Sequence, residues 1–171
     1  VYKRQLLARH GITLPEFAPE THKALLDFIS PMGTILKNPV DLASSGFRPN
    51  VIEKALNIVG QDPNIDFILF VSQLGLTGGG VLETFKAILR NQVQEIVSAC
   101  RAIDLPVLCN NPIPYDSLAV EELRFYVKGE LEKNRIPTFL TFDRTVRALK
   151  RYHDYGLYCR NKARQSLHPS L

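Results

Sequence analysis

The residues of this sequence best suited to binding an anion form a short T-G-G-G stretch. Thr77, Gly78, Gly79 and Gly80 follow an apolar run and stand directly before a long helical pattern that begins at Val81. Glycines let the backbone approach a ligand closely, and a helix N-terminus offers unpaired N–H groups and the positive end of the helix dipole. The stretch predicts a site for a phosphate or a phosphorylated side chain. A simple turn between a strand and a helix is the alternative.

Two further groups of polar residues could line a ligand site. Asn110 and Asn111 end an apolar run, where their amides could bind a ligand or could simply make a turn before Pro112. Asn38 and Asp41 belong to L-K-N-P-V-D-L-A, in which an acid stands between two aliphatic residues. Asp41 is therefore either a turn-capping residue or a member of a site, and its spacing from Asn38 favours side-chain-to-backbone turn bonding.

Nucleophilic and metal chemistry find little support in the sequence. Cys100, Cys109 and Cys159 form neither a C-x-x-C pair nor a metal-ligand spacing, so free thiols in a reducing cytoplasm are expected. The four histidines are scattered, without an H-E-x-x-H motif, and no G-x-S-x-G elbow is present. We therefore predict no metal site and assign no catalytic residue.

Composition bounds the class of protein. With 171 residues, 45% hydrophobic and 22% charged, the chain can build one globular domain with tails. The net charge of +4 is concentrated late in the chain, but no nucleic-acid motif accompanies it. No apolar run approaches the ~20 residues of a membrane helix, and no signal peptide is visible. We expect a cytoplasmic protein that binds neither nucleic acid nor membrane, and its start at Val1 indicates a piece of a longer protein.

Helical patterns alternate with short β-prone apolar runs. Helices are expected at 2–10, 19–29, 49–60, 81–102, 117–133 and 143–155, with Pro49 at the first position of its helix and Asp143 as a cap. Strands are expected at 66–72, 105–110 and 136–140, with 34–36 as a fourth candidate. This alternation predicts a small parallel sheet with helices on both faces. Ligands of such sheets bind at the carboxyl ends of the strands, where the glycine stretch and the two asparagines fall.

Several motifs, in order, resemble one family. They are N-P-V-D-L at 38–42, E-K-A-L at 53–56, D-P-N-I-D at 62–66, D-L-P-V-L at 104–108, R-I-P-T-F-L-T at 135–141 and T-V-R-A-L-K-R-Y at 145–152. Together they resemble the second flavodoxin-like CoA-ligase domain of the NDP-forming (ADP-forming) acyl-CoA synthetases, relatives of succinyl-CoA synthetase. The resemblance covers residues 8–155.

The resemblance implies a flavodoxin-like three-layer sandwich with three to four parallel strands. Residues 1–30 would be lead-in helices from a preceding domain, 31–155 the CoA-ligase domain and 156–171 a basic C-terminal tail. The family joins a carboxylic acid to CoA, with ATP converted to ADP and phosphate through a phosphohistidine. CoA and ATP/ADP with Mg²⁺ would bind the full-length enzyme, and none is expected on this domain alone.

The remaining parts of the enzyme would be partners, in the same chain or in another subunit. They are a CoA-binding Rossmann domain, a flavodoxin-like domain with the phosphohistidine and an ATP-grasp domain. This domain would help to complete the phosphohistidine site, with Asp41 as a conformational anchor near the ligand edge, and the isolated chain would be inactive. The alternatives are a non-catalytic interaction or regulatory domain of an acyl-CoA synthetase-like or acetyltransferase fusion protein, and a free-standing small-molecule binder.

Overall fold

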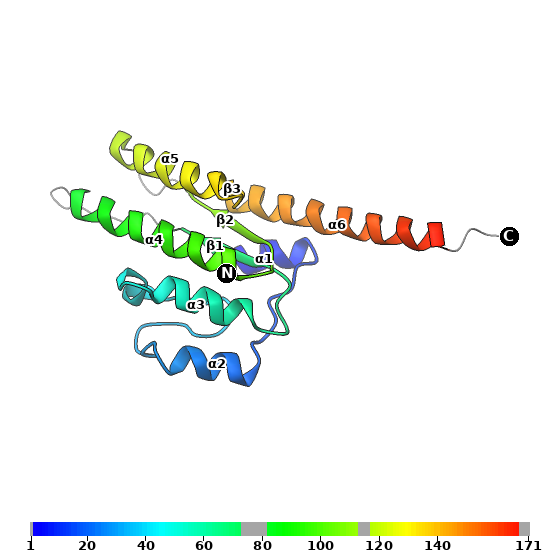
Figure 1. Cartoon of the computed structure of the whole chain (residues 1–171), viewed down its shortest axis with the longest axis horizontal. Coiled ribbons are helices and arrows are strands. Elements are labelled where there is room, and N and C mark those ends of the chain that lie inside the picture. The colour runs from blue at the N-terminus through cyan, green and yellow to red at the C-terminus, as the bar shows by residue number, and fades with distance from the viewer. Residues whose placement is uncertain (1, 73–81, 113–116, 168–171) are drawn as a thin grey trace.

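The computed structural model describes residues 2–72, 82–112 and 117–167. Figure 1 shows a small central sheet with helices around it and one long helix that runs out to the C-terminal side. In chain order the elements are α1 (Tyr2–Arg9), α2 (Pro19–Leu26), the short 3-10 helix η1 (Ala43–Phe47), α3 (Val51–Gly60), β1 (Ile68–Val71), α4 (Leu82–Ala102), β2 (Val107–Asn110), α5 (Leu118–Lys133), β3 (Thr138–Phe139) and α6 (Phe142–Leu167).

The sheet is parallel and has the order β1-β2-β3 in the described part of the chain. Ile68 pairs with Val107 at the start of the β1–β2 ladder, and Cys109 pairs with Thr138 between β2 and β3. All four residues of β2 are buried, as a central strand covered on both faces requires. The predicted α/β class with a small parallel sheet is confirmed, and the arrangement is consistent with a flavodoxin-like fold.

The two faces of the sheet carry different helices. Ile68 and Phe70 of β1 belong to the large apolar cluster that α3, α4 and α5 build, whereas Leu69 packs with Leu6 of α1 and Val146 of α6. Successive strand residues point to opposite faces. Helices therefore cover both faces, α3, α4 and α5 on one and α1 and α6 on the other, which gives the expected three layers.

The predicted fourth strand at 34–36 is not part of this sheet. Ile35 instead forms an isolated antiparallel bridge with Asp41, with N–H···O distances of 2.8 and 2.7 Å. The chain between them turns back through a cis Asn38–Pro39 bond. This candidate does not join the sheet, because the backbone groups of Ile35 bond to the returning chain and not to a neighbouring strand. The three observed strands lie within the expected three to four.

A buried carboxylate holds the N-terminus of α3. Asn50, the residue before α3, has a left-handed backbone (φ +64°) and makes no side-chain cap. Glu95 of α4, only 8% exposed, accepts N–H bonds from Asn50 (2.8 Å), Ile52 (3.0 Å) and Glu53 (3.3 Å). The helix thus begins at Val51, two residues after the predicted position of Pro49, and a side chain from another helix caps it.

A second buried acid connects α2 to the turn before β1. Asp62 accepts N–H bonds from Ala18 (2.9 Å), which precedes α2, and from Asn64 (2.8 Å) within its own turn. Burial raises the pKa of Asp62, but hydrogen bonds from Thr21, Asn64 and Ala18 outweigh that effect, and the net pKa is below the ordinary 3.8. The charged form of Asp62 therefore stabilises this junction.

The last helix differs from its prediction at both ends. Thr141 Oγ1 accepts the N–H of Arg144 (3.3 Å), so Thr141 caps α6, and the expected cap Asp143 instead pairs with Arg147 (2.6 Å). The residues predicted as a basic tail continue α6 as far as Leu167. Among the described residues, no helix combines the length and the apolar character that a membrane-spanning segment requires.

Replacing Glu95 with Gln should destabilise the fold by about 2 kcal/mol, because an amide removes the charge and one acceptor oxygen from the three N–H groups at the start of α3. Urea unfolding followed by circular dichroism measures the change. Glu122→Gln is the matched control, since Glu122 is exposed on α5, and its effect should stay within about 0.5 kcal/mol. Equal losses in the two variants would show that Glu95 has no special structural role.

Asp62→Asn should lower stability at neutral pH and lose this effect in acid. The folded-state pKa of Asp62 is depressed, so its contribution is present above the unfolded pKa and disappears as pH falls through the folded value. The stability gap between the natural protein and the variant should therefore close below about pH 4. Denaturant midpoints measured from about pH 6 down to about pH 2.5 test this, and a gap that stays constant over that range would contradict the assignment.

Candidate functional site at the carboxyl edge of the sheet

The carboxyl ends of the three strands form one continuous edge. The N–H of Ser72 donates to the carbonyl of Asn110 (2.9 Å), and the N–H of Asn111 donates to the carbonyl of Phe139 (2.8 Å), so the parallel ladder extends past the strand ends. Ser72, Asn110 and Asn111 are all buried. Polar residues at this edge are therefore held by backbone bonds on either side.

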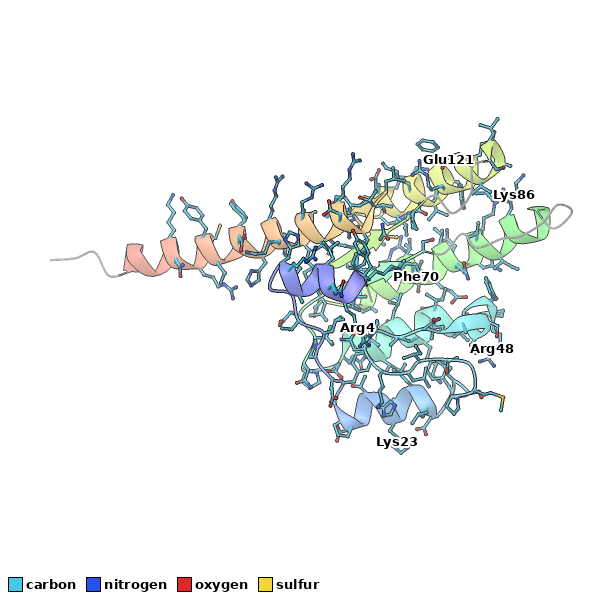
Figure 2. All side chains as sticks on the ribbon, turned by 180° about the vertical axis from the view of Figure 1, so that it is seen from behind. Arg4, Lys23, Arg48, Phe70, Lys86 and Glu121 are labelled. Carbon is cyan, nitrogen blue, oxygen red and sulfur yellow. The ribbon has the colours of Figure 1, made fainter. Side chains whose placement is uncertain are left out.

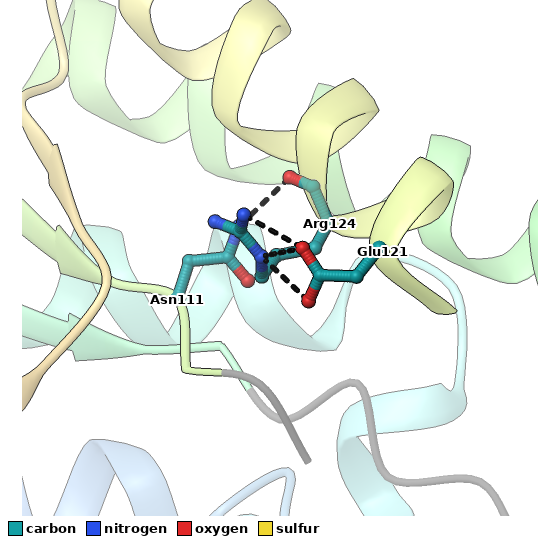
Figure 3. Close-up of polar contacts among 3 residues, drawn as sticks. All are labelled: Asn111, Glu121 and Arg124. Atoms are coloured by element: carbon teal, nitrogen blue, oxygen red, sulfur yellow. Dashed lines mark hydrogen bonds and ion pairs between the residues drawn. The ribbon is translucent and has the colours of Figure 1, made fainter. Parts of the chain in front are cut away.

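Asn110 and Asn111 hold neighbouring elements with their side chains. Asn110 Nδ2 donates to the carbonyl of Phe139 (3.2 Å), which ties β2 to β3. Asn111 Nδ2 donates to the carbonyl of Arg124 (3.0 Å) in α5, as Figure 3 shows. Asn111 is fully buried, and its Oδ1 has no hydrogen-bond partner among the described residues. Both asparagines therefore serve the frame of the edge, and their predicted contact with a ligand stays a prediction.

Beside Asn111 lies an ion pair that the sequence reasoning missed. Arg124 Nε lies 3.0 Å and Nη2 lies 2.8 Å from Glu121 Oε2 (Figure 3). The Arg124 guanidinium also lies over the Phe125 ring, 4.5 Å from its centre. The side chain of Arg124 is 8% exposed and that of Glu121 is 26% exposed. The spacing of three residues on a helix indicates a contact between them. It does not reveal that the arginine is buried.

The other predicted ligand residues bond to a different part of the chain. Asn38 Nδ2 donates to the carbonyl of Pro15 (3.0 Å), and the exposed Asp41 accepts the N–H of Ala43 (2.9 Å) through Oδ1. Ala43 begins η1 with a positive φ of 46°. These bonds are the side-chain-to-backbone turn contacts that the sequence favours for this stretch. None of their hydrogen bonds joins them to Asn110 or Asn111, and a ligand role for them stays a prediction.

The predicted phosphate-binding residues Thr77, Gly78, Gly79 and Gly80 lie outside the described residues, which resume at α4. Their role therefore stays a prediction from the sequence. Among the residues that the structure describes, no group of three His, Cys, Asp or Glu side chains could hold a metal ion.

The cysteines near the sheet are protonated thiols at neutral pH. Burial raises the pKa of Cys109, in β2, to about 12, and burial raises that of Cys100, in α4, to about 11. The thiolate is the nucleophilic form of cysteine, so a raised pKa makes these side chains inert. Cys159 of α6 is exposed. The described residues at this edge therefore provide hydrogen-bonding groups and a defined backbone shape. The two buried cysteines near it do not support nucleophilic chemistry.

Arg124→Met should destabilise the protein by about 1–3 kcal/mol, because it leaves the partly buried Glu121 carboxylate without its cation. The matched control is Lys128→Met on the same helix, whose partner Glu132 is half-exposed, and its cost should stay below about 0.5 kcal/mol. Thermal unfolding of both variants gives the comparison. Similar losses in the two would mean that the burial of Arg124 adds nothing to its ion pair.

Neither the protein-family models nor the curated proteins contain a match to this sequence. Among solved structures, the chain is similar to PH0766 from Pyrococcus horikoshii OT3, with a TM-score of 0.67 and 24% sequence identity. The match covers 86% of this chain and 31% of PH0766, so the chain spans about a third of that longer protein. At this identity the likeness shows the fold, which PH0766 shares over nearly the whole of this chain.

Proposed function

We propose that this chain is the second flavodoxin-like CoA-ligase domain of an NDP-forming acyl-CoA synthetase. The observation that carries the proposal is the order of its motifs along the fold. N-P-V-D-L (38–42) leads into η1, D-P-N-I-D (62–66) into β1, D-L-P-V-L (104–108) into β2 and R-I-P-T-F-L-T (135–141) through β3 to the cap of α6. Three of these motifs thus border or form strands of one parallel sheet, and the first leads into η1.

The role of this domain is to position a phosphoryl group. The phosphohistidine itself belongs to a preceding flavodoxin-like domain, CoA to a Rossmann domain and the nucleotide with Mg²⁺ to an ATP-grasp domain. The T-G-G-G stretch at 77–80 contributes backbone N–H groups, and the helix that follows contributes the positive end of its dipole. Such groups stabilise negative charge without a catalytic side chain. This role needs no nucleophile, and none of the four histidines of this chain lies in the glycine stretch.

The share of PH0766 that this chain matches also supports a domain role. A chain that corresponds to about a third of a longer protein has the size of one module in a multidomain enzyme. In the described part of the chain β1 is an outer strand of which only Ile68 is buried, which fits a neighbouring module on that side of the sheet. The isolated domain is accordingly expected to have no turnover of its own.

The test uses the intact parent protein with ATP, CoA and a panel of short carboxylic acids. We expect acid-labile, base-stable phosphorylation from ATP and the release of ADP with acyl-CoA. Gly79→Asp should reduce phosphorylation at least about tenfold, because a carboxylate would repel the phosphoryl group at close range. Gly129→Asp in α5 is the control, since a Cβ added at Gly129 meets no atom of a neighbouring segment within 4 Å.

A second measurement addresses the phosphate site alone. Backbone amide shifts of residues 77–81 should move in millimolar phosphate and stay unchanged in chloride at equal ionic strength. Unchanged shifts in both would remove the phosphate role. Phosphate binding in an intact protein that forms no acyl-CoA would instead assign the chain to a non-catalytic regulatory domain.

A further inference from the structure

The long helix α6 has an anchored part and a projecting part. Thr145, Val146 and Leu149 are buried against the body of the protein. From Arg151 to Lys162 every side chain is exposed, and only Gly156 is half-buried. Figures 1 and 2 show this second part extending away from the sheet, with none of the other described elements alongside it. We refer to residues 151–162 as the projecting segment, which spans roughly 18 Å.

The projecting segment is rich in exposed aromatic side chains. Tyr152, Tyr155 and Tyr158 are 62%, 66% and 59% exposed, and the rings of Tyr155 and Tyr158 lie 6.5 Å apart. On a helix, Tyr152, Tyr155 and Cys159 share one stripe, which continues the direction of the buried anchor. Single exposed aromatics are ordinary on a protein surface, but a stripe on a helix without neighbours is typical of an interface.

Charge on the projecting segment is positive. Asp154 is its only acidic residue, and Asp154 pairs with Lys150 one turn earlier. Arg151 and Arg160 are exposed on either side of the aromatic stripe. The sequence contains no Asp or Glu after Asp154. A solvated helix usually carries interspersed charges of both signs. The excess of positive charge on the projecting segment therefore favours an anionic partner.

No described element packs on the projecting segment, although packing stabilises most helices in proteins. Isolated helices shorter than about 12–15 residues are marginal in water, and most helical stability in proteins comes from packing an apolar face. The anchored turns supply a nucleus for α6, but they do not cover its tyrosines. Tyrosine and arginine are the residue types that most often dominate binding energy at protein interfaces.

We propose that the projecting segment of α6 docks into a groove on the acidic surface of a protein partner, with the tyrosines in the groove and the arginines on its acidic rim. This is the recognition mode of an amphipathic helix in a groove. The proposal rests on the contacts and charges of α6 alone and is independent of the proposed enzymatic function.

Charge and aromatic geometry favour an acidic protein partner over a second copy of the chain, a lipid surface or single-stranded nucleic acid. A second copy would place two positively charged segments side by side, which repel each other. A lipid surface favours Trp, Phe and Leu on the buried face, whereas this stripe consists of two tyrosines with polar hydroxyls and a cysteine. Single-stranded nucleic acid uses open aromatic faces as stacking platforms, whereas the Tyr155 and Tyr158 rings pack against each other.

The experiment places the photo-crosslinking residue benzoylphenylalanine at Tyr155 of the intact protein in its own cells. We expect a covalent adduct to one protein, with the cross-linked peptide mapping to a surface rich in Asp and Glu. The same residue placed at Tyr2 of α1, which is 63% exposed, should not give that adduct. The double variant Arg151→Glu, Arg160→Glu should reduce the yield at Tyr155 at least about tenfold through like-charge repulsion.

Lys37→Glu is the matched charge reversal at an exposed site outside α6, and it should leave the yield unchanged. Circular dichroism of each variant checks that helix content is retained. An adduct to a second copy of the chain, to lipid or to nuclease-sensitive material would overturn the proposal. So would the absence of any adduct, or a yield that the two arginine reversals do not change.

Discussion

The carboxylate of Glu95 is the contact on which the position of the N-terminal half of the chain depends. It brings a negative charge to the N-terminus of α3, where three backbone N–H groups point at it. The helix dipole and the hydrogen bonds act in the same direction, and the low exposure of Glu95 strengthens both. A free helix end at this depth would leave donors unpaired, at a cost comparable to that of a lost hydrogen bond each.

A second contact at the other end of α3 completes its attachment to α4. A Cβ at Gly60 would lie 2.7 Å from Ile103 Cγ1, so only glycine permits this approach of the two segments. Between the two ends, Ile52 and Leu56 belong to the large apolar cluster against the sheet. Val51 and Ala55 belong to a second apolar cluster, which includes Leu25 of α2. Because α3 belongs to both clusters, its attachment to α4 also fixes the position of α2 relative to the sheet.

Helices and strands were predictable from the sequence where the pattern of hydrophobic residues is clear. The apolar runs at 67–71 and 107–109 are continuous and β-prone, and both form parallel strands of a sheet that helices cover on both faces. The short run at 34–36 carries the same signal, but the turn at Asn38 and Asp41 uses its backbone. A short apolar run does not by itself indicate which segment it pairs with. Its pairing also depends on residues elsewhere in the chain.

Charged residues were the least predictable, because their usual position is on the surface. Glu95 falls in a helical pattern where an acid ordinarily faces solvent, and only the approach of α3 makes it a cap. Arg124 is similar, since its spacing from Glu121 indicates an ion pair on any helix. The length of α6 was underestimated for a related reason. Residues after 155 have no apolar period that a single domain would require, yet they contain few strong helix breakers.

The buried asparagines at the carboxyl edge of the sheet hold neighbouring elements together. At the carboxyl edge the buried asparagines bond to β3 and α5, and the nearby thiols are held protonated by burial. The polar groups that the structure describes there are therefore committed to the frame, with Asn111 Oδ1 as the exception. A rigid frame of this kind fixes where the strands end and where the following helices begin. Under the proposed function, backbone N–H groups at helix starts would meet an anion with little reorganisation, which is how preorganised dipoles stabilise charge.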